Sequence, residues 1–159
     1  MASILPSFIS TYLPQHPGLL PQWLLLVSLI SVGNSIQAYT TLTFTSRVYA
    51  GWAPSKPTPA KNKSPSTTST SPATPLSSRT FGTWTLIQSI VRLYAAYHIS
   101  NPQIYEMAFL TYAVAWLHFM SEWWVFGSAR WGAGLAGPVF VASGSLVWMW
   151  LQWGFYVPA

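Results

Sequence analysis

The chain has 159 residues, of which seven are basic and two are acidic, and 51% are hydrophobic. Charged residues make up only 6% of it, against roughly 25% in a soluble domain. This excludes an ordinary cytosolic enzyme and a nucleic-acid-binding protein, despite a formal net charge of +5. The lack of cysteine excludes disulfides, thiolate zinc sites and a cysteine nucleophile. The composition therefore predicts a single-domain membrane protein.

The first part of the chain is predicted to be a tail followed by a membrane span. Four prolines interrupt the short apolar runs of residues 1–21, so this tail is not expected to form a long helix. Residues 22–40 hold no charged residue, and a helix of this length rises about 28 Å, close to the hydrocarbon thickness of a bilayer. Asn34 and Gln37 share one face of this span. They are predicted either to hydrogen-bond a neighbouring helix or to belong to a partner interface.

Residues 53–78 differ in composition from the rest of the chain. They consist mainly of Pro, Ser and Thr, hold no aromatic residue, and have Leu76 as their one large aliphatic residue. Such a segment cannot bury enough apolar surface to offset the entropy lost on ordering. We therefore predict a disordered first loop.

Three more apolar segments follow this loop and complete the predicted fold. Only helices and closed barrels satisfy their backbone hydrogen bonds in lipid, and these apolar runs are too long for barrel strands. We therefore predict an all-α membrane protein, a bundle of four transmembrane helices within residues 22–153, followed by a C-terminal tail at 154–159. The last span is rich in Gly, Ala and Ser, which favours close approach to another helix. The predicted spans are residues 22–40, 80–98, 103–125 and 133–153.

The distribution of basic residues predicts the orientation of the bundle. With four spans, both termini and the turn at 99–102 lie on one side, and the first and third loops lie on the other. The two latter loops hold every basic residue outside the spans, so the positive-inside rule places them in the cytosol and both termini in the lumen. These basic residues are Arg47, Lys56, Lys61, Lys63, Arg79 and Arg130.

The charged residues of the spans are predicted to form two ion pairs. A charged side chain that faces lipid is costly, so these residues should face the bundle interior. Counted from the turn at Asn101, Arg92 lies close in depth to Glu106, and Arg79 lies at nearly the same depth as Glu122. The preferred interpretation is a hairpin clamped by these two pairs, and the alternative is a proton relay or a catalytic role.

His118 and Glu122 share one helix face, but they are weak evidence for a metal site. The HExxH signature is absent, and three histidines cannot build a di-iron site. We therefore expect His118 to be a hydrogen-bonded interior residue, and we predict no catalytic residue, metal or cofactor.

Five motifs lie in a characteristic order along the chain. They are Gly33–Gln37 in the first span, Arg79–Thr85 opening the second, Arg92 within it, His118–Glu122 closing the third, and Phe126–Ala129 in the loop that follows. Together they resemble the ergosterol biosynthetic protein 28 family, over roughly residues 22–52 and 79–153.

The resemblance implies a multi-pass protein of the endoplasmic reticulum membrane without catalytic activity, which acts as a scaffold in ergosterol synthesis. It implies four protein partners: the sterol C-4 methyl oxidase, the C-3 sterol dehydrogenase/decarboxylase, the 3-keto sterol reductase and the sterol C-24 methyltransferase. The first three are the enzymes of C-4 demethylation. Membrane lipid is expected to surround the chain, and no nucleic acid is expected as a partner. The candidate interface or structural polar residues are Asn34, Gln37, Arg79, Thr80, Phe81, Gly82, Trp84, Arg92, Glu106, His118 and Glu122.

Two other functions remain open at this point. The chain could bind and present a sterol or another lipid in a groove lined by Trp84, Trp116 and Trp148. Less favoured is a membrane enzyme that uses His118 and Glu122.

Overall fold

The computed structural model describes residues 12–51 and 71–158. No strand occurs within these residues, so the all-helical prediction is confirmed for them. The parts of the predicted tail and loop at 1–11 and 53–70 lie outside the described residues. The helices are α2 (Leu20–Thr40), α3 (Thr43–Val48), α4 (Pro75–Tyr97), α5 (Pro102–Trp124), α6 (Ala133–Leu151) and α7 (Trp153–Tyr156).

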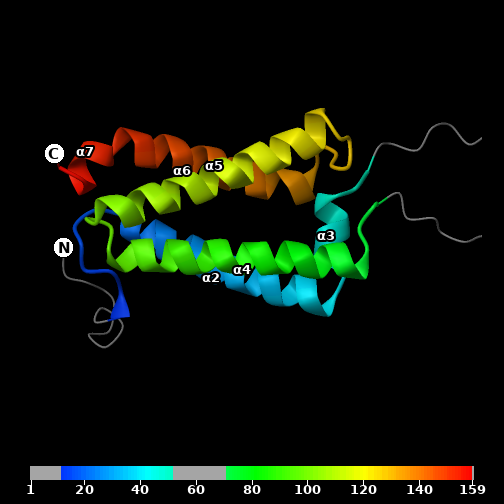
Figure 1. Cartoon of the computed structure of the whole chain (residues 1–159), viewed down its shortest axis with the longest axis horizontal. Coiled ribbons are helices and arrows are strands. Elements are labelled where there is room, and N and C mark those ends of the chain that lie inside the picture. Colours follow the sequence, from blue (N-terminus) through cyan, green and yellow to red (C-terminus); the bar gives the residue numbers. More distant parts are fainter. Residues whose placement is uncertain (1–11, 52–70, 159) are drawn as a thin grey trace, which may run out of the picture.

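The four long helices form two antiparallel pairs (Figure 1). α2 lies alongside α4, α5 packs on α6, and contacts between α4 and α5 join the pairs. The short helix α7 and the turn between α4 and α5 lie at one end of the bundle. α3 and the loop at 125–132 lie at the other end, which we call the α3 end.

α4 begins within the segment that was predicted to be a disordered loop. Thr74 caps it: the Ser77 amide donates to Thr74 Oγ1 at 3.1 Å, and the Thr74 amide donates to Ser77 Oγ at 2.9 Å. Pro75 occupies the first helical turn, where its missing N–H costs nothing. The loop prediction is therefore wrong for residues 75–78. The capping residues Thr74 and Ser77 lie in a Pro-, Ser- and Thr-rich stretch, whose composition alone indicated a disordered loop.

The segment between α3 and α4 has its two ends close together. The Ser71 hydroxyl donates to the carbonyl of Tyr49 at 2.6 Å. The amide of Gly51 donates to the carbonyl of Ser128 at 2.9 Å. Both ends of this segment are thus fixed to the α3 end of the bundle.

Small residues set the contact between α2 and α4. The hydroxyl of Ser28 donates to the carbonyl of Ser89 at 2.9 Å, and the hydroxyl of Ser35 donates to the carbonyl of Gly82 at 2.7 Å. A Cβ on Gly82 would lie 3.1 Å from the carbonyl oxygen of Ser35. This glycine and the two serines therefore let the two backbones approach closely, as small residues do between membrane helices.

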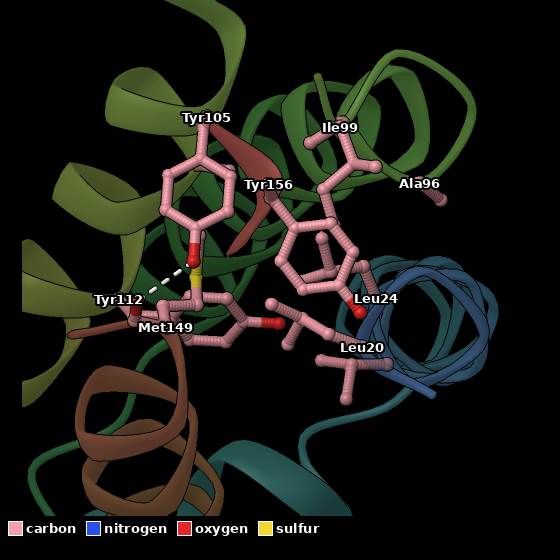
Figure 2. Packing of buried hydrophobic residues seen from close by; sticks show 11 residues of the cluster. Leu20, Leu24, Ala96, Ile99, Tyr105, Tyr112, Met149 and Tyr156 are labelled. Carbon is pink, nitrogen blue, oxygen red and sulfur yellow. Dashed lines mark hydrogen bonds between the residues drawn. The ribbon is translucent and has the colours of Figure 1, made fainter. Parts of the chain in front are cut away.

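Two clusters of buried apolar residues hold the pairs together. One lies at the α7 end (Figure 2), where the Tyr105 hydroxyl donates to the carbonyl of Met149 at 2.7 Å and Tyr156 reaches over to the start of α2. The other cluster lies at the α3 end and includes Val48, Phe119 and Leu135.

Two helices of the described residues, α2 and α6, are long and apolar enough to cross a membrane by length and composition, whereas four spans were expected. α4 and α5 fall short because they carry charged, amide and hydroxyl side chains that lower their hydropathy. All four long helices nevertheless expose large apolar side chains. These include Leu26, Leu29 and Ile36 on α2, Leu86, Ile87 and Ile90 on α4, Leu110, Val114 and Leu117 on α5, and Phe140, Val147 and Trp150 on α6.

Candidate functional site

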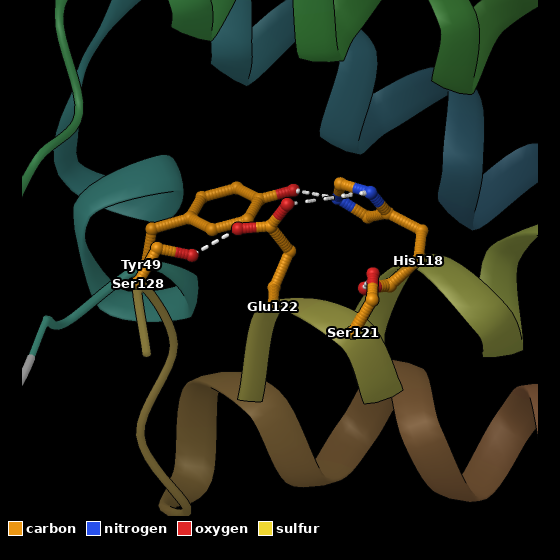
Figure 3. Close-up of polar contacts among 5 residues, drawn as sticks. All are labelled: Tyr49, His118, Ser121, Glu122 and Ser128. Carbon is orange, nitrogen blue, oxygen red and sulfur yellow. Dashed lines mark hydrogen bonds and ion pairs between the residues drawn. The ribbon is translucent and has the colours of Figure 1, made fainter. Parts of the chain in front are cut away.

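A cluster of polar side chains, here called the histidine cluster, lies at the α3 end of the bundle (Figure 3). The Tyr49 hydroxyl lies 2.6 Å from Nε2 of His118. Glu122 Oε1 lies 4.0 Å from Nδ1 of the same ring, and Glu122 Oε2 accepts a hydrogen bond from the Ser128 hydroxyl. The histidine cluster (Tyr49, His118, Glu122 and Ser128) therefore ties the end of α3 and the loop after α5 to the last turns of α5.

Aromatic rings surround the imidazole of His118. Its centroid lies 5.4 Å from that of Trp84, 5.3 Å from that of Phe119 and 5.9 Å from that of Tyr49. Burial raises the pKa of the Tyr49 phenol, and the Glu122 carboxylate raises it further. The protonated phenol can donate to Nε2, and in that tautomer Nδ1 carries the imidazole proton and faces Glu122.

The histidine cluster adjoins a surface pocket of about 510 Å³ beside the start of α4. Thr80 and Trp84 line this pocket together with His118 and Glu122. No group of three or more His, Asp or Glu side chains within residues 12–51 and 71–158 could hold a metal ion. A histidine held between a phenol and a carboxylate could transfer a proton. The same contacts also have a structural role, because the histidine cluster joins the end of α3, the last turns of α5 and the loop at 125–132.

Neither predicted ion pair forms among the described residues, so both predictions are wrong. Arg92 points into the bundle and donates to Gln88 and Thr111. Glu106 is exposed on the outside of α5. Glu106 follows the buried Tyr105, so a helical step of one residue turns it away from the interior. Counting depth along the hairpin does not take into account the faces on which these residues lie.

The second predicted pair fails for the same reason. Arg79 is exposed next to the buried Ser78. Glu122 instead lies between His118 and Ser128.

The remaining candidate residues divide into packed and exposed positions. Phe81 and Gly82 are buried within the chain, so they support packing rather than a free interface. Thr80 and Gln37 are exposed. Asn34 is half-buried and lines a cavity between the helix pairs.

A second feature, here called the central cavity, lies between the helix pairs and has a volume of about 440 Å³. Its walls come from α2, α4, α5 and α6, with α3 at one end. Trp84 lines it, but Trp116 and Trp148 are not among its lining residues, so the tryptophan groove is not formed as predicted. Trp148 instead lies against Trp23, with ring centroids 6.2 Å apart.

Sequence reasoning missed Tyr49 in the histidine cluster and Gln88, Thr111 and Tyr112 around Arg92. Gln88 lies one helical turn before Arg92, which is a signal that could have been read. Tyr49 lies 69 residues from His118, and no local pattern joins the two.

The comparisons with known proteins agree on one family. The family model described as Erg28 like protein matches residues 20–147. "Ergosterol biosynthetic protein 28" of Candida albicans is 50% identical over 140 residues, covering 88% of this chain and 89% of the relative. The protein of the same name in Saccharomyces cerevisiae is 42% identical over 87% of this chain and 83% of the relative. The human "Ergosterol biosynthetic protein 28 homolog" is 34% identical over 83% of both chains. No solved structure shows a significant match.

Proposed function

Because the chain belongs to the family described as Erg28 like protein, we propose that it serves ergosterol synthesis as a non-catalytic scaffold in the endoplasmic reticulum membrane. The names of its relatives give a role in ergosterol biosynthesis and no reaction. The enzymes that it would tether are those of sterol C-4 demethylation, namely the C-4 methyl oxidase, the C-3 dehydrogenase/decarboxylase and the 3-keto reductase, together with the C-24 methyltransferase. Tethered enzymes meet intermediates at an effective concentration in the millimolar range.

The proposal includes four membrane spans, and the faces that the helices turn outward support it. On α4, the polar Gln88, Ser89 and Arg92 are buried, while Ile87 and Ile90 are exposed. In water this arrangement would expose apolar surface and bury charge, both at a cost in free energy. In lipid it is the favourable arrangement, because polar groups then face the bundle. α5 also exposes large apolar side chains, among them Leu110, Val114 and Leu117, although its Glu106 is exposed as well. These outward faces support spans beyond α2 and α6.

The α3 end is the cytosolic end in this proposal. The three described arginines that lie outside the bundle interior, Arg47, Arg79 and Arg130, are all exposed there. The positive-inside rule places such an end in the cytosol. The α7 end then faces the lumen.

The proposal rests on a group of exposed side chains at the α3 end, which we call the cytosolic platform: Arg79, Thr80, Trp124, Phe126 and Arg130. Trp124 and Phe126 are 68% and 67% exposed. Tryptophan and arginine are enriched in the residues that dominate protein interfaces. The histidine cluster holds the loop that carries Phe126 and Arg130, and such preorganisation lowers the cost of binding a partner.

Affinity purification of the full chain in mild detergent tests this proposal. The test variant combines Trp124→Ala with Phe126→Ala. The matched control combines Trp150→Ala with Phe140→Ala, which removes the same residue types at the same exposure from the face of α6. We expect the test variant to lose the co-purifying C-4 demethylation enzymes, and cells that carry it to accumulate C-4 methylated sterols. The control should retain the enzymes and keep a normal sterol composition. Equal recovery of the enzymes by both variants would refute the platform, and sterol turnover by the purified chain alone would refute the scaffold.

The histidine cluster separates the scaffold from a membrane enzyme. An enzyme that uses His118 and Glu122 would lose turnover in His118→Ala while its complex still assembled. A scaffold in which His118 positions the platform would instead lose partners in that variant.

A further inference from the structure

We propose that the central cavity is a binding site for a lipid carboxylic acid, whose carboxylate pairs with Arg92. The site is independent of the cytosolic platform, because it lies inside the bundle and shares no residue with the platform.

The cavity has the size and access of a lipid site. Its volume of about 440 Å³ lies within the roughly 300–1,000 Å³ that is common for small-molecule pockets. Four of its lining residues are exposed: Ile30 on α2, Arg47 on α3, and Ala133 and Gly137 on α6. The cavity therefore opens between α2 and α6, and this opening extends to the α3 end. In the proposed membrane orientation the part of this opening beside Ile30 and Gly137 faces lipid.

The opening is bounded by one contact of α2 with α6 and one contact of α3 with α6. At one end, the indole Nε1 of Trp23 donates to the Ser145 hydroxyl at 2.9 Å. At the other end, the backbone of α3 at Arg47 lies against Gly134, with no room for a Cβ on that glycine. The walls between these points are largely apolar and include Val27, Val141 and Ala142.

Arg92 places an uncompensated positive charge at this apolar cavity. The side chain is 6% exposed and lines the cavity. Its hydrogen bonds go to neutral groups: Gln88 Oε1 at 2.8 Å, Thr111 Oγ1 at 3.1 Å and the Thr111 carbonyl at 3.3 Å. The guanidinium also lies 4.0 Å from the ring centroid of Tyr112.

The chain itself supplies no counter-ion for this guanidinium within the described residues. Its two acidic residues are Glu106, which is exposed on α5, and Glu122, which belongs to the histidine cluster. Burying a charge without an opposite charge is costly. Nη1 of Arg92 also has no acceptor among residues 12–51 and 71–158.

Two hydroxyls add unused hydrogen-bonding capacity beside Arg92. Thr85 Oγ1 and Tyr112 Oη are buried and have no hydrogen bond of standard geometry within the described residues, although Ser145 lies next to Tyr112. Both residues line the cavity. A carboxylate fits this set, because it accepts from a guanidinium fork and from hydroxyl donors at the same time. The apolar walls then require a large apolar body on the same molecule.

The experiment measures equilibrium binding to the full chain in lipid nanodiscs, with empty nanodiscs as the blank. The probes are cholanic acid, a rigid steroid acid, its methyl ester, and oleic acid, a linear acid. We expect one of the acids to bind at least tenfold more tightly than the ester. The comparison of the two acids shows whether the cavity prefers a rigid steroid acid or a linear fatty acid. Equal binding of cholanic acid and its ester, with no binding of oleic acid above the blank, would overturn the site.

Two variants locate the binding. Gly137→Leu should fill the mouth, because an added Cβ there meets no atom within 4 Å, and it should lower affinity at least tenfold. Gly144→Leu is the matched control, because it also meets no atom within 4 Å, lies two turns along the same helix and is outside the cavity lining. Arg92→Gln should remove the preference for acid over ester. Unchanged affinity in Gly137→Leu would place the ligand elsewhere, whereas failure of the scaffold would appear in the purification experiment and leave these results intact.

Discussion

Gly82→Leu tests whether Gly82 packs α2 against α4 or belongs to a partner interface. A Cβ at this position would lie 2.8 Å from Cδ2 of Tyr39 and 3.1 Å from the carbonyl oxygen of Ser35. The exposed Tyr39 ring can turn away, although it would then lose its 2.6 Å hydrogen bond to Thr83. The Ser35 carbonyl belongs to the backbone of α2 and can move only if the helix moves.

The magnitude follows from three contributions. Overpacking costs about 1–3 kcal/mol, and loss of the buried Ser35–Gly82 hydrogen bond costs about 1 kcal/mol. Replacing glycine inside a helix returns about 1 kcal/mol. We therefore expect a net loss of about 2 kcal/mol in the free energy of unfolding, which lowers the unfolding midpoint by about 4–8 °C in a chain of this size.

Thermal unfolding of the full chain in detergent, followed by tryptophan fluorescence, measures this change. Gly144→Leu is the control, because its new side chain meets open space and should raise stability by about 1 kcal/mol through helix propensity. The two variants are thus expected to change stability in opposite directions. If Gly82→Leu unfolded at the wild-type temperature but lost its protein partners, Gly82 would belong to an interface and the packing argument would be wrong.

Three further changes probe other parts of the structure. Tyr49→Phe should lower stability by about 1 kcal/mol, because His118 Nε2 loses its partner; an unchanged unfolding midpoint would show that this hydrogen bond does not stabilise the fold. Thr74→Ala should cost about 1 kcal/mol and speed amide exchange in the first turn of α4 alone, whereas unaltered exchange at Ser77 would argue against the cap. Asn62-Lys63-Ser64 in the first loop is a glycosylation sequon. It should remain unmodified in cells while an acceptor engineered into the 99–101 turn is glycosylated, and the reverse pattern would invert the proposed topology.

Long apolar segments could be predicted from the sequence because they reflect composition alone. α2 ends at Thr40 as expected and begins at Leu20, close to the predicted start. The turn between α4 and α5 was also readable, since Asn101 caps α5 with its side chain and Pro102 follows. By contrast, the first turn of α4 lay in a stretch whose composition resembles that of a disordered loop.

The polar contacts were not predictable because they depend on the rotation of each helix and on distant partners. Glu106 and Arg92 were paired by depth alone, but one residue of offset from the buried Tyr105 turns Glu106 outward. The small residues of the last span allow a close approach as expected, at Gly134 against the backbone of α3, but the close contact of α2 with α4 at Ser35 and Gly82 was not predicted. Apolar periodicity is weak in helices that are apolar on most faces, so it could not assign these rotations.

The hydrogen bond between Ser71 and the carbonyl of Tyr49 fixes the exit and re-entry points of the intervening segment side by side. A chain that leaves and returns at neighbouring points can change in length at little cost, since doubling such a loop adds only about 0.6 kcal/mol of closure entropy. Evolution can therefore lengthen or shorten this stretch without disturbing the helices on either side. The same property makes it a suitable position for inserting a fluorescent protein or an epitope.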